Sequence, residues 1–163
     1  MDTKPLPVKD GILLRETTVD DIAEIVRHRR AMFEDMGVGD SASLDRMVSA
    51  SGPYWQAVIA EDCYRGWFAM TAPNQVAGGV GILLQSSPPR PWEVRSRRAY
   101  LLNLYVYPKH RRQGIARLLT EASVEWCRRE GFVTVSLHAS ELGRPLYESL
   151  GFAPTNEMRL RLR

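Results

Sequence analysis

A short cationic turn that contains a glycine is the part of this sequence with the clearest chemical potential. It reads "KHRRQGIA" over residues 109–116, between an apolar, aromatic run at 100–107 and an amphipathic segment that begins at Ile115. The first backbone N–H groups of a helix have no partner inside it, and the helix dipole adds partial positive charge there. A strand, a cationic turn and a helix in this order therefore predict a site for a phosphate group.

Two common phosphate-binding patterns do not fit this turn. A P-loop ends in Gly-Lys-Ser/Thr, which is absent here. The dinucleotide fingerprint needs three spaced glycines, whereas only Gly114 lies in the turn. A basic loop that simply caps a helix is the alternative, and for the turn by itself the two interpretations are about equally favoured.

Two motifs together resemble one family of enzymes. The stretch "VYPKHRRQGIARLL" resembles the acetyl-CoA signature of the GCN5-related N-acetyltransferases, Arg/Gln-x-x-Gly-x-Gly/Ala, at Arg111, Gly114 and Ala116. Further along, "LHASELGRPLYESLGF" resembles the family's closing motif, in which a tyrosine, here Tyr147, precedes Leu-Gly-Phe. The motifs occur in the family's order, with room between them for one helix and one strand.

The resemblance implies acetyl-CoA as the acyl donor, with no metal. The backbone amides expected to hold its pyrophosphate are those of Arg111, Arg112, Gln113, Gly114, Ile115 and Ala116. The pantetheine arm contains amides and can pair like an extra strand with an open sheet edge, here Leu104, Tyr105 and Val106. Ser140 stands where the family commonly has an asparagine that touches this arm, and its hydroxyl can make one such bond.

The implied reaction is acetyl transfer to a primary amine of a small molecule or peptide, by direct attack in a ternary complex. It needs a held acyl donor, an uncharged amine, a stabilised oxyanion and a proton for the departing thiolate. The backbone N–H of Tyr105 or Val106 is expected to face the oxyanion. Tyr147 is expected to be the general acid, because a phenol is protonated at neutral pH. A tyrosine that packs at a helix end is the alternative.

The general base is open. Many family members carry a glutamate on the strand that corresponds to 100–107, but here Asn103 is the only comparable polar side chain. His138, Glu34 and a chain of water molecules are the candidates. The missing glutamate also keeps a non-catalytic acyl-CoA-binding module as the alternative function.

The acceptor side is less marked in the sequence. In the resembling family the end of the first helix and the loop after it wall the acceptor site. This makes Glu34, Asp35 and Met36 substrate-side candidates, together with Asn103 and His138.

Several nearby residues have a simpler interpretation. The methionines and phenylalanine of the first helix are more often core than ligand pocket. Arg27, Arg29 and Arg30 are most simply a solvated helix face. Tyr54 and Trp55 either pack on the sheet or line an acceptor tunnel, and packing is favoured.

Length, composition and charge indicate what class of protein this is. The chain has 163 residues, 44% of them hydrophobic and 25% charged, as expected for one globular domain spanning 1–163. A net charge of +3 does not require a nucleic-acid partner. No apolar signal core or membrane-spanning run is present, and Cys63 and Cys127 have no metal-type spacing, so we expect a cytoplasmic protein with reduced thiols. Dimers are usual in the family, which makes a homodimer one candidate state.

Hydrophobic periodicity predicts the elements that position these residues. Strands are expected at 12–15, 64–71, 75–85, 100–107, 133–139 and 156–163. Helices are expected at 18–36, at 41–60 as one helix or two short ones, at 115–130 and at 140–150, with Ser140 as the cap of the last. Residues 1–10 are expected to be a flexible lead-in. Gly78, Gly79 and Gly81 precede no helix, so they indicate a bulge or a close approach within a strand. The order predicts an α+β fold: a mixed, mostly antiparallel sheet flanked by helices in three layers.

Overall fold

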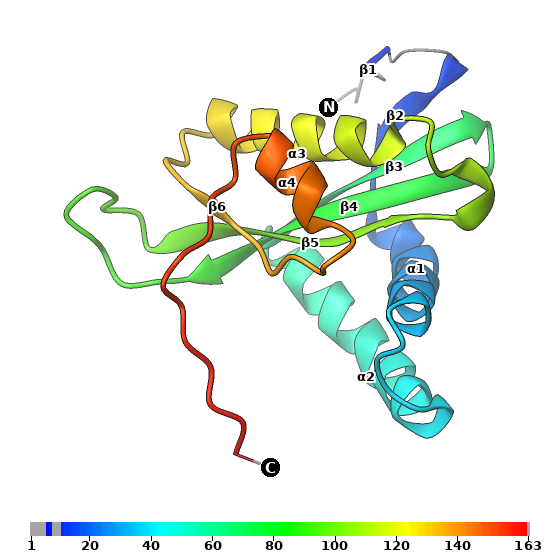
Figure 1. Cartoon of the computed structure of the whole chain (residues 1–163), viewed down its shortest axis with the longest axis horizontal. Coiled ribbons are helices and arrows are strands. Elements are labelled where there is room, and N and C mark those ends of the chain that lie inside the picture. Colours follow the sequence, from blue (N-terminus) through cyan, green and yellow to red (C-terminus); the bar gives the residue numbers. More distant parts are fainter. Residues whose placement is uncertain (1–5, 8–10, 163) are drawn as a thin grey trace.

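A six-stranded sheet runs through the middle of the molecule in the computed structural model, which describes residues 6–7 and 11–162 (Figure 1). Its strands follow one another along the sheet in chain order. They are β1 (Leu6–Pro7), β2 (Leu13–Glu16), β3 (Tyr64–Ala72), β4 (Gln75–Ser86), β5 (Arg97–Val106) and β6 (Val135–Ser136). All neighbours are antiparallel except β5 and β6, which are parallel. The predicted α+β class is confirmed.

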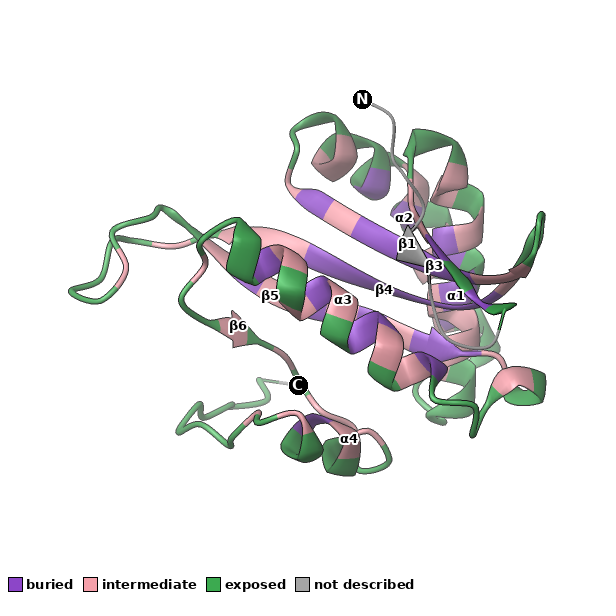
Figure 2. Ribbon diagram, turned by 90° about the horizontal axis from the view of Figure 1, so that it is seen from above, coloured by how far each residue is buried: buried purple, intermediate pink, exposed green. Residues whose placement is uncertain are grey.

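Helices cover both faces of this sheet. The helices are α1 (Ile22–Asp35), α2 (Ser41–Ala60), α3 (Ile115–Arg129) and α4 (Arg144–Ser149). In Figure 1, α1 and α2 lie on one side of the sheet, and α3 and α4 lie on the other. Figure 2 shows that buried residues concentrate in β3, β4 and β5 and along α3. Each face has its own apolar cluster, so the sheet is the layer that both clusters share.

The apolar stripe of α3 explains why this helix lies along the sheet. Ile115, Leu119 and Cys127 are buried, whereas Arg128 on the same helix is exposed. The stripe follows the helical repeat, so only one side of the helix is apolar. The first residue of α3 is thereby anchored in the core, and this fixes the position of the turn before it.

The glycines of β4 occur where neighbouring chain comes close, as predicted. The register between β4 and β5 shifts between Gly79 and Gly81, which marks a bulge. A Cβ at Gly81 would lie 2.4 Å from the Tyr64 ring, and one at Gly79 would lie 2.8 Å from the Phe68 ring. The glycines therefore allow close packing and do not bind a dinucleotide.

The first helix begins slightly later than predicted. A short 3-10 turn at Val19–Asp21 precedes α1. The backbone N–H of Thr18 donates to the carboxylate of Asp21 at 2.8 Å, and Arg15 pairs with the same carboxylate at 2.8 Å. These bonds hold the pKa of Asp21 below its usual range, with the Arg15 bond the larger cause.

The predicted strand at 156–163 is wrong for the residues that the structure describes. Met158, Leu160 and Leu162 are 94%, 81% and 86% exposed, and residues 153–162 have no strand pairing. Alternation of apolar and polar residues permits a strand, but a strand forms only where an edge is available to pair with. The neighbouring β6 has only two residues, so it presents almost no edge.

Two other expectations are corrected in the same region. The strand predicted at 133–139 is reduced to β6, because only Val135 and Ser136 pair with β5. Ser140 does not cap α4, which begins at Arg144 after Gly143. Its hydroxyl accepts the Gly143 N–H at 3.1 Å and closes a turn before the helix.

The expected flexibility of residues 1–10 falls mostly outside the described residues. Leu6 and Pro7 pair with Leu14 and Leu13 as a short outer strand, so this part of the lead-in is structured. Residues 1–5 and 8–10 are not described.

Candidate active site

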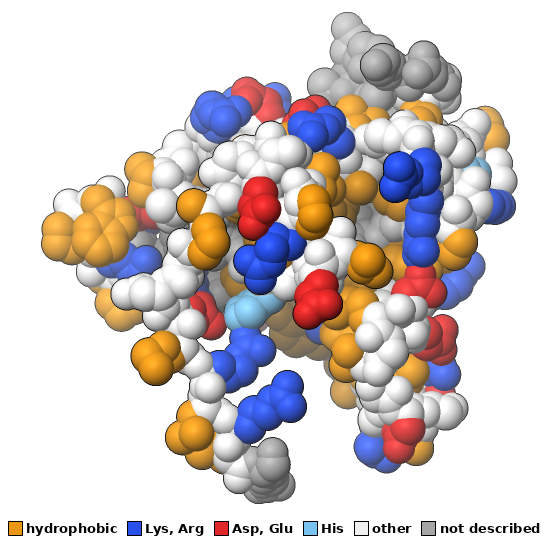
Figure 3. Space-filling model, in the orientation of Figure 1, with side chains coloured by type: hydrophobic (Ala, Val, Ile, Leu, Met, Phe, Trp, Pro, Cys, Tyr) orange, Lys and Arg blue, Asp and Glu red, His pale blue; other side chains and the backbone are white. Residues whose placement is uncertain are grey.

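A cleft of ≈ 1690 Å³ opens beside β5, and all four named helices contribute to its lining. Figure 3 looks onto this face and shows a recess between α4 with the C-terminal segment and the pair α1 and α2. Pockets for a single small ligand usually measure about 300–1,000 Å³. The cleft therefore has room for two substrates at once.

The cationic turn forms one end of the cleft and leaves backbone amides free. Gly114, the residue just before α3, has a left-handed backbone (φ 78°), and Arg112 is left-handed too (φ 63°). No side chain caps the first turn of α3. A Cβ at Gly114 would meet no atom within 4 Å, so the space beside these amides is open. Uncapped amides of this kind, with arginines around them, fit a pyrophosphate.

Arg111 ties this turn to the end of the strand and to the first helix. Its Nε donates to the carbonyl of Val106 at 2.9 Å. Its terminal nitrogen pairs with the carboxylate of Asp35, which also accepts the Tyr105 hydroxyl at 3.1 Å. The Arg111 bond is the main reason that the pKa of Asp35 lies below its usual range.

The side of β5 that faces β6 is open over most of its length. In the described part of the chain, only Ala99 and Tyr100 pair with β6. On the other side, the N–H of Tyr107 donates to the carbonyl of Ala77 at the end of the sheet, 2.9 Å away. The stretch 101–106 therefore has one paired side and one open side. An extended ligand can pair with a strand only along such an open side.

A bulge in β5 turns Asn103 towards α1. Asn103 has a left-handed backbone (φ 56°) opposite the register shift in β4. Asparagine tolerates this conformation better than most residues with a side chain. Its Oδ1 accepts a hydrogen bond from Arg29 on α1, and its buried Nδ2 has no partner among the described residues.

Tyr147 reaches the cleft from α4. The residue is 8% exposed and its ring packs edge-on against Phe152, with the ring centroids 5.6 Å apart. It also belongs to the lining of the cleft. Burial raises the pKa of Tyr147 to about 12, so its hydroxyl keeps its proton at neutral pH.

The comparison with protein families decides what this arrangement is. The family model of the acetyltransferase (GNAT) family matches residues 26–152, which include most of α1, all of α2 and β5, the cationic turn and Tyr147. This chain belongs to the GNAT family. The resemblance found in the two sequence motifs is confirmed.

Solved GNAT structures share the whole fold. A GCN5-related N-acetyltransferase from Ralstonia eutropha superposes with a TM-score of 0.85 at 33% identity, over 93% of this chain and 99% of that one. A protein from Clostridium acetobutylicum, described as a predicted acetyltransferase and solved with acetyl-CoA, gives 0.83 at 27% identity, over 93% and 96% of the two chains.

Curated relatives match over a shorter region. Human N-acetyltransferase 8 is 33% identical over 94 residues, which is 56% of this chain and 39% of the human protein. The matched region thus spans about two-fifths of the relative's length.

Most residues expected from the GNAT motifs line the cleft. On the donor side these are Leu104, Tyr105, Val106, Arg111, Arg112, Gly114, Ile115, Ala116, Ser140 and Tyr147. On the acceptor side they are Asp35, Met36, Asn103 and His138. Gln113 belongs to the same turn but does not line the cleft.

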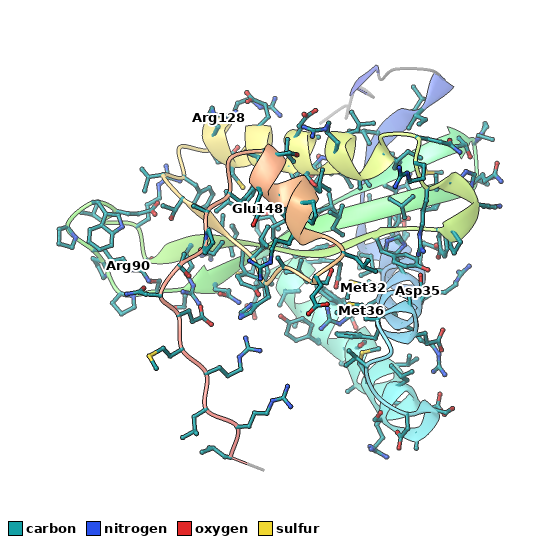
Figure 4. All side chains as sticks on the ribbon, in the orientation of Figure 1. Met32, Asp35, Met36, Arg90, Arg128 and Glu148 are labelled. Atoms are coloured by element: carbon teal, nitrogen blue, oxygen red, sulfur yellow. The ribbon has the colours of Figure 1, made fainter. Side chains whose placement is uncertain are left out.

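Glu34 is the expected site residue that the fold turns away from the cleft. It is exposed and pairs with Arg30 at 2.7 Å. A helix turns about 100° per residue. Met32, Asp35 and Met36 line the cleft at the end of α1, as Figure 4 shows. Glu34 is not among the residues that line it.

His138 lies at the rim of the cleft. Its Nδ1 contacts the Tyr100 hydroxyl, and its Nε2 is 3.2 Å from the carboxylate of Glu157. It is exposed to solvent. Arg159 also contacts Nε2, so both ring nitrogens have partners at the rim.

The predicted solvated face is wrong for Arg29, which the sequence motifs do not place at the site. Arg29 is only partly exposed and lines the cleft. The missed signal is its spacing, because Arg29, Met32, Phe33 and Met36 stand at i, i+3, i+4 and i+7 and so share one side of α1. The aromatics of α2 have divided roles: Trp55 is buried at 2% exposure, whereas Tyr54 is 46% exposed, and both contribute to the lining.

Neither a membrane-spanning helix nor a cluster of metal-ligating side chains occurs in residues 6–7 and 11–162. No helix in this part of the chain combines the length and apolarity needed to cross a membrane. No three His, Cys, Asp or Glu side chains there are grouped as they would be around a metal ion. Cys63 and Cys127 are free thiols.

Proposed function

We propose that this chain is an N-acetyltransferase that moves an acetyl group from acetyl-CoA to a primary amine of a small molecule or peptide, by direct attack in a ternary complex. One observation supports this most: a single cleft joins the uncapped amides of α3, the open edge of β5 and the protonated hydroxyl of Tyr147. Binding of two substrates needs both a donor and an acceptor wall, and the cleft has both.

The donor side would be held by groups that are already in place. The amides of the turn and the side chains of Arg111 and Arg112 suit a diphosphate. The edge of β5 at Leu104–Val106 and the Ser140 hydroxyl suit the amides of a pantetheine arm. Acetyl-CoA supplies an activated thioester carbonyl when it is bound.

The alternation of β5 favours Val106 over Tyr105 as the donor to the oxyanion. Tyr107 directs its N–H towards the paired side of β5, where it meets Ala77. Successive peptide groups of a strand point to opposite sides. The N–H of Val106 is then expected on the open side, while that of Tyr105 is expected on the paired side.

Tyr147 is the proposed general acid. Its raised pKa, about 12, keeps the proton on the phenol until a thiolate forms beside it. Of the candidates for accepting the proton of the amine, His138 lines the cleft and Glu34 does not. We therefore propose His138 or water in this role.

The experiment that tests the assignment is the Tyr147→Phe variant. We expect kcat to fall about 100-fold, as for loss of one general acid, with the Kd for acetyl-CoA within about twofold of wild type. The rate is measured as CoA release with a thiol reagent over a panel of amines, and the Kd by calorimetry. Tyr107→Phe is the matched control, because the Tyr107 hydroxyl donates to Glu24 and Tyr107 does not line the cleft.

Two results would contradict the proposal at different points. Unchanged turnover in Tyr147→Phe removes Tyr147 from the chemistry. Acetyl-CoA binding without CoA release over a broad amine panel supports the alternative, a non-catalytic acyl-CoA-binding module, which the absence of a glutamate in β5 favours. A single domain over 1–163, a cytoplasmic location and a homodimer stay predictions.

A further inference from the structure

Arg29 is the one arginine of its cluster on α1 that has no carboxylate partner in the described part of the chain. Its neighbours are paired: Arg27 with Glu24 at 2.8 Å, and Arg30 with Glu34 at 2.7 Å and Asp45 at 2.6 Å. No ion pair involves Arg29 among these residues, although it is only partly exposed and lines the cleft.

The surroundings of Arg29 are neutral and largely apolar. Its guanidinium lies over the ring of Phe33, 4.8 Å from the centroid, and donates to Oδ1 of Asn103. Burial lowers the pKa of Arg29, but a guanidinium titrates so far above neutrality that the group stays charged. A charge held away from water without a counter-ion is costly, and an anionic ligand would relieve that cost.

The rest of the cleft does not compete for this charge. Asp35 is the only carboxylate among the residues that line it, and Asp35 is already bonded to Arg111 and Tyr105. The cleft wall therefore offers little to a polycationic acceptor. It offers an unpaired cation to an acceptor that carries a negative group.

The chain next to Arg29 sets the distance from the charge to the reacting amine. Asn103, which holds the guanidinium, directly precedes the strand edge at Leu104–Val106 where the thioester is proposed to lie. Val106, whose N–H is proposed to face the oxyanion, lies three residues beyond Asn103, so the backbone spans at most about 10 Å between them. A single small acceptor that carries both a carboxylate and an amine can reach across such a distance.

The remaining walls suit an apolar side chain. Near Arg29 the lining is formed by Met32, Phe33, Met36, Met47 and Tyr54. Methionine side chains adapt to irregular apolar groups. We propose that Arg29 binds the carboxylate of the acceptor, and that the acceptor is an amino acid with an apolar side chain. This inference rests on the proposed acetyltransferase function and adds the substrate class.

The test compares three acceptors that differ only at the carboxylate: L-phenylalanine, phenylalaninamide and phenethylamine. With wild-type protein and acetyl-CoA, we expect kcat/KM for L-phenylalanine to exceed the other two by about 10- to 100-fold, since a site built for a charged group rejects analogues that lack it. In Arg29→Gln the ratio should fall to near one, with an unchanged Kd for acetyl-CoA. Arg29→Lys keeps the charge without the planar fork, so its ratio should be intermediate.

A control variant and a binding measurement distinguish failure of the Arg29 site from failure of the proposed acetyltransferase function. Arg27→Gln, on the exposed side of the same helix, should keep the wild-type ratio. A wild-type preference for phenethylamine, or a ratio that Arg29→Gln leaves intact, overturns the inference. Calorimetry with N-acetyl-L-phenylalanine and N-acetylphenethylamine measures the same preference without turnover. Carboxylate-dependent binding through Arg29 with no turnover of any amine supports the subsite and overturns the acetyltransferase function.

Discussion

His28 is an ionisable residue that the fold keeps neutral. It is 2% exposed, and its Nε2 lies 3.0 Å from the carbonyl oxygen of Tyr105. A carbonyl can only accept, so Nε2 carries the proton and Nδ1, which has no partner in the described structure, does not. The rings of Tyr105 and Tyr107 pack edge-on against the imidazole at 5.0 and 5.3 Å. Burial is the main reason that its pKa is lowered to about 4.

This residue predicts a loss of stability in mild acid. In the unfolded chain His28 binds a proton below about pH 6.5, whereas in the folded chain it does so only below about pH 4. The free energy of unfolding therefore falls as the pH is lowered from 6.5 to 4, and His28 causes no further fall below pH 4. The loss is about 3 kcal/mol at most, at about 1.4 kcal/mol per pH unit. Urea unfolding of wild type and His28→Gln between pH 7 and pH 4 measures it.

The variant isolates His28 from the carboxylates. The pKa values of Asp21, Asp35 and Asp40 are lowered, so these groups also lose their stabilising effect as the pH falls. They are common to both proteins, and the difference between the two pH profiles therefore reports His28. Parallel profiles would show that its burial has no such effect.

The glycine-containing strand β4 determines where the donor edge of β5 lies. A Cβ at Gly78 would be 2.8 Å from the carbonyl oxygen of Tyr105 and 3.2 Å from the Cα of Val106. Both are backbone atoms, so no side-chain movement relieves the contact. Any larger residue there must displace β5 itself, together with the edge on which the thioester is proposed to lie.

We expect Gly78→Ala to lower the free energy of unfolding by about 1–3 kcal/mol, as overpacking does, and to weaken acetyl-CoA binding. Gly52→Ala is the control, because Gly52 lies within α2 and a Cβ there would meet nothing within 4 Å apart from its chain neighbours. The gain in helix propensity there is opposed by Pro53, which disfavours the helical conformation of a preceding residue with a Cβ, so we expect a change in stability of less than about 1 kcal/mol and unchanged acetyl-CoA binding. Chemical denaturation and calorimetry give both quantities. Equal effects of the two substitutions on stability and on acetyl-CoA binding would show that the close approach of Gly78 to β5 does not control either quantity.

At the scale of the whole molecule, the cleft joins two separately packed faces. One apolar cluster includes α3 and Tyr147 of α4, and the other includes Trp55 of α2 and Ile25 of α1. The lining of the cleft takes residues from both sides of the sheet. A ligand in the cleft therefore contacts elements of both faces and favours the folded state as a whole.

Thermal unfolding with and without acetyl-CoA tests this link. At a concentration about 100 times Kd, binding adds about 2.7 kcal/mol of stability, or roughly 5–10 °C in Tm for a chain of this length. S-acetylpantetheine has no diphosphate for the turn before α3, so at the same concentration it should give a much smaller shift. Equal shifts would mean that the diphosphate is not bound there, and the absence of any shift would remove acetyl-CoA as the donor.

The sequence alone determined the features that depend on neighbours along the chain. The periodicity of α1, α3, β4 and β5 sets which side of each element is buried, and the turn with Gly114 and the motif with Tyr147 each lie within one short stretch. Such local patterns need no knowledge of the rest of the fold. They were enough to identify the family, and most of the site residues predicted from them line the cleft.

Only the tertiary structure decided which of these residues share one site. Arg29 and Glu34 are five positions apart on one helix, yet the packing of α1 turns Arg29 into the cleft and Glu34 out of it. The alternating segment around Leu160 has the pattern of a strand but no edge to pair with. Charge burial and strand pairing depend on surfaces brought together from distant parts of the chain, and a local pattern carries no information about such surfaces.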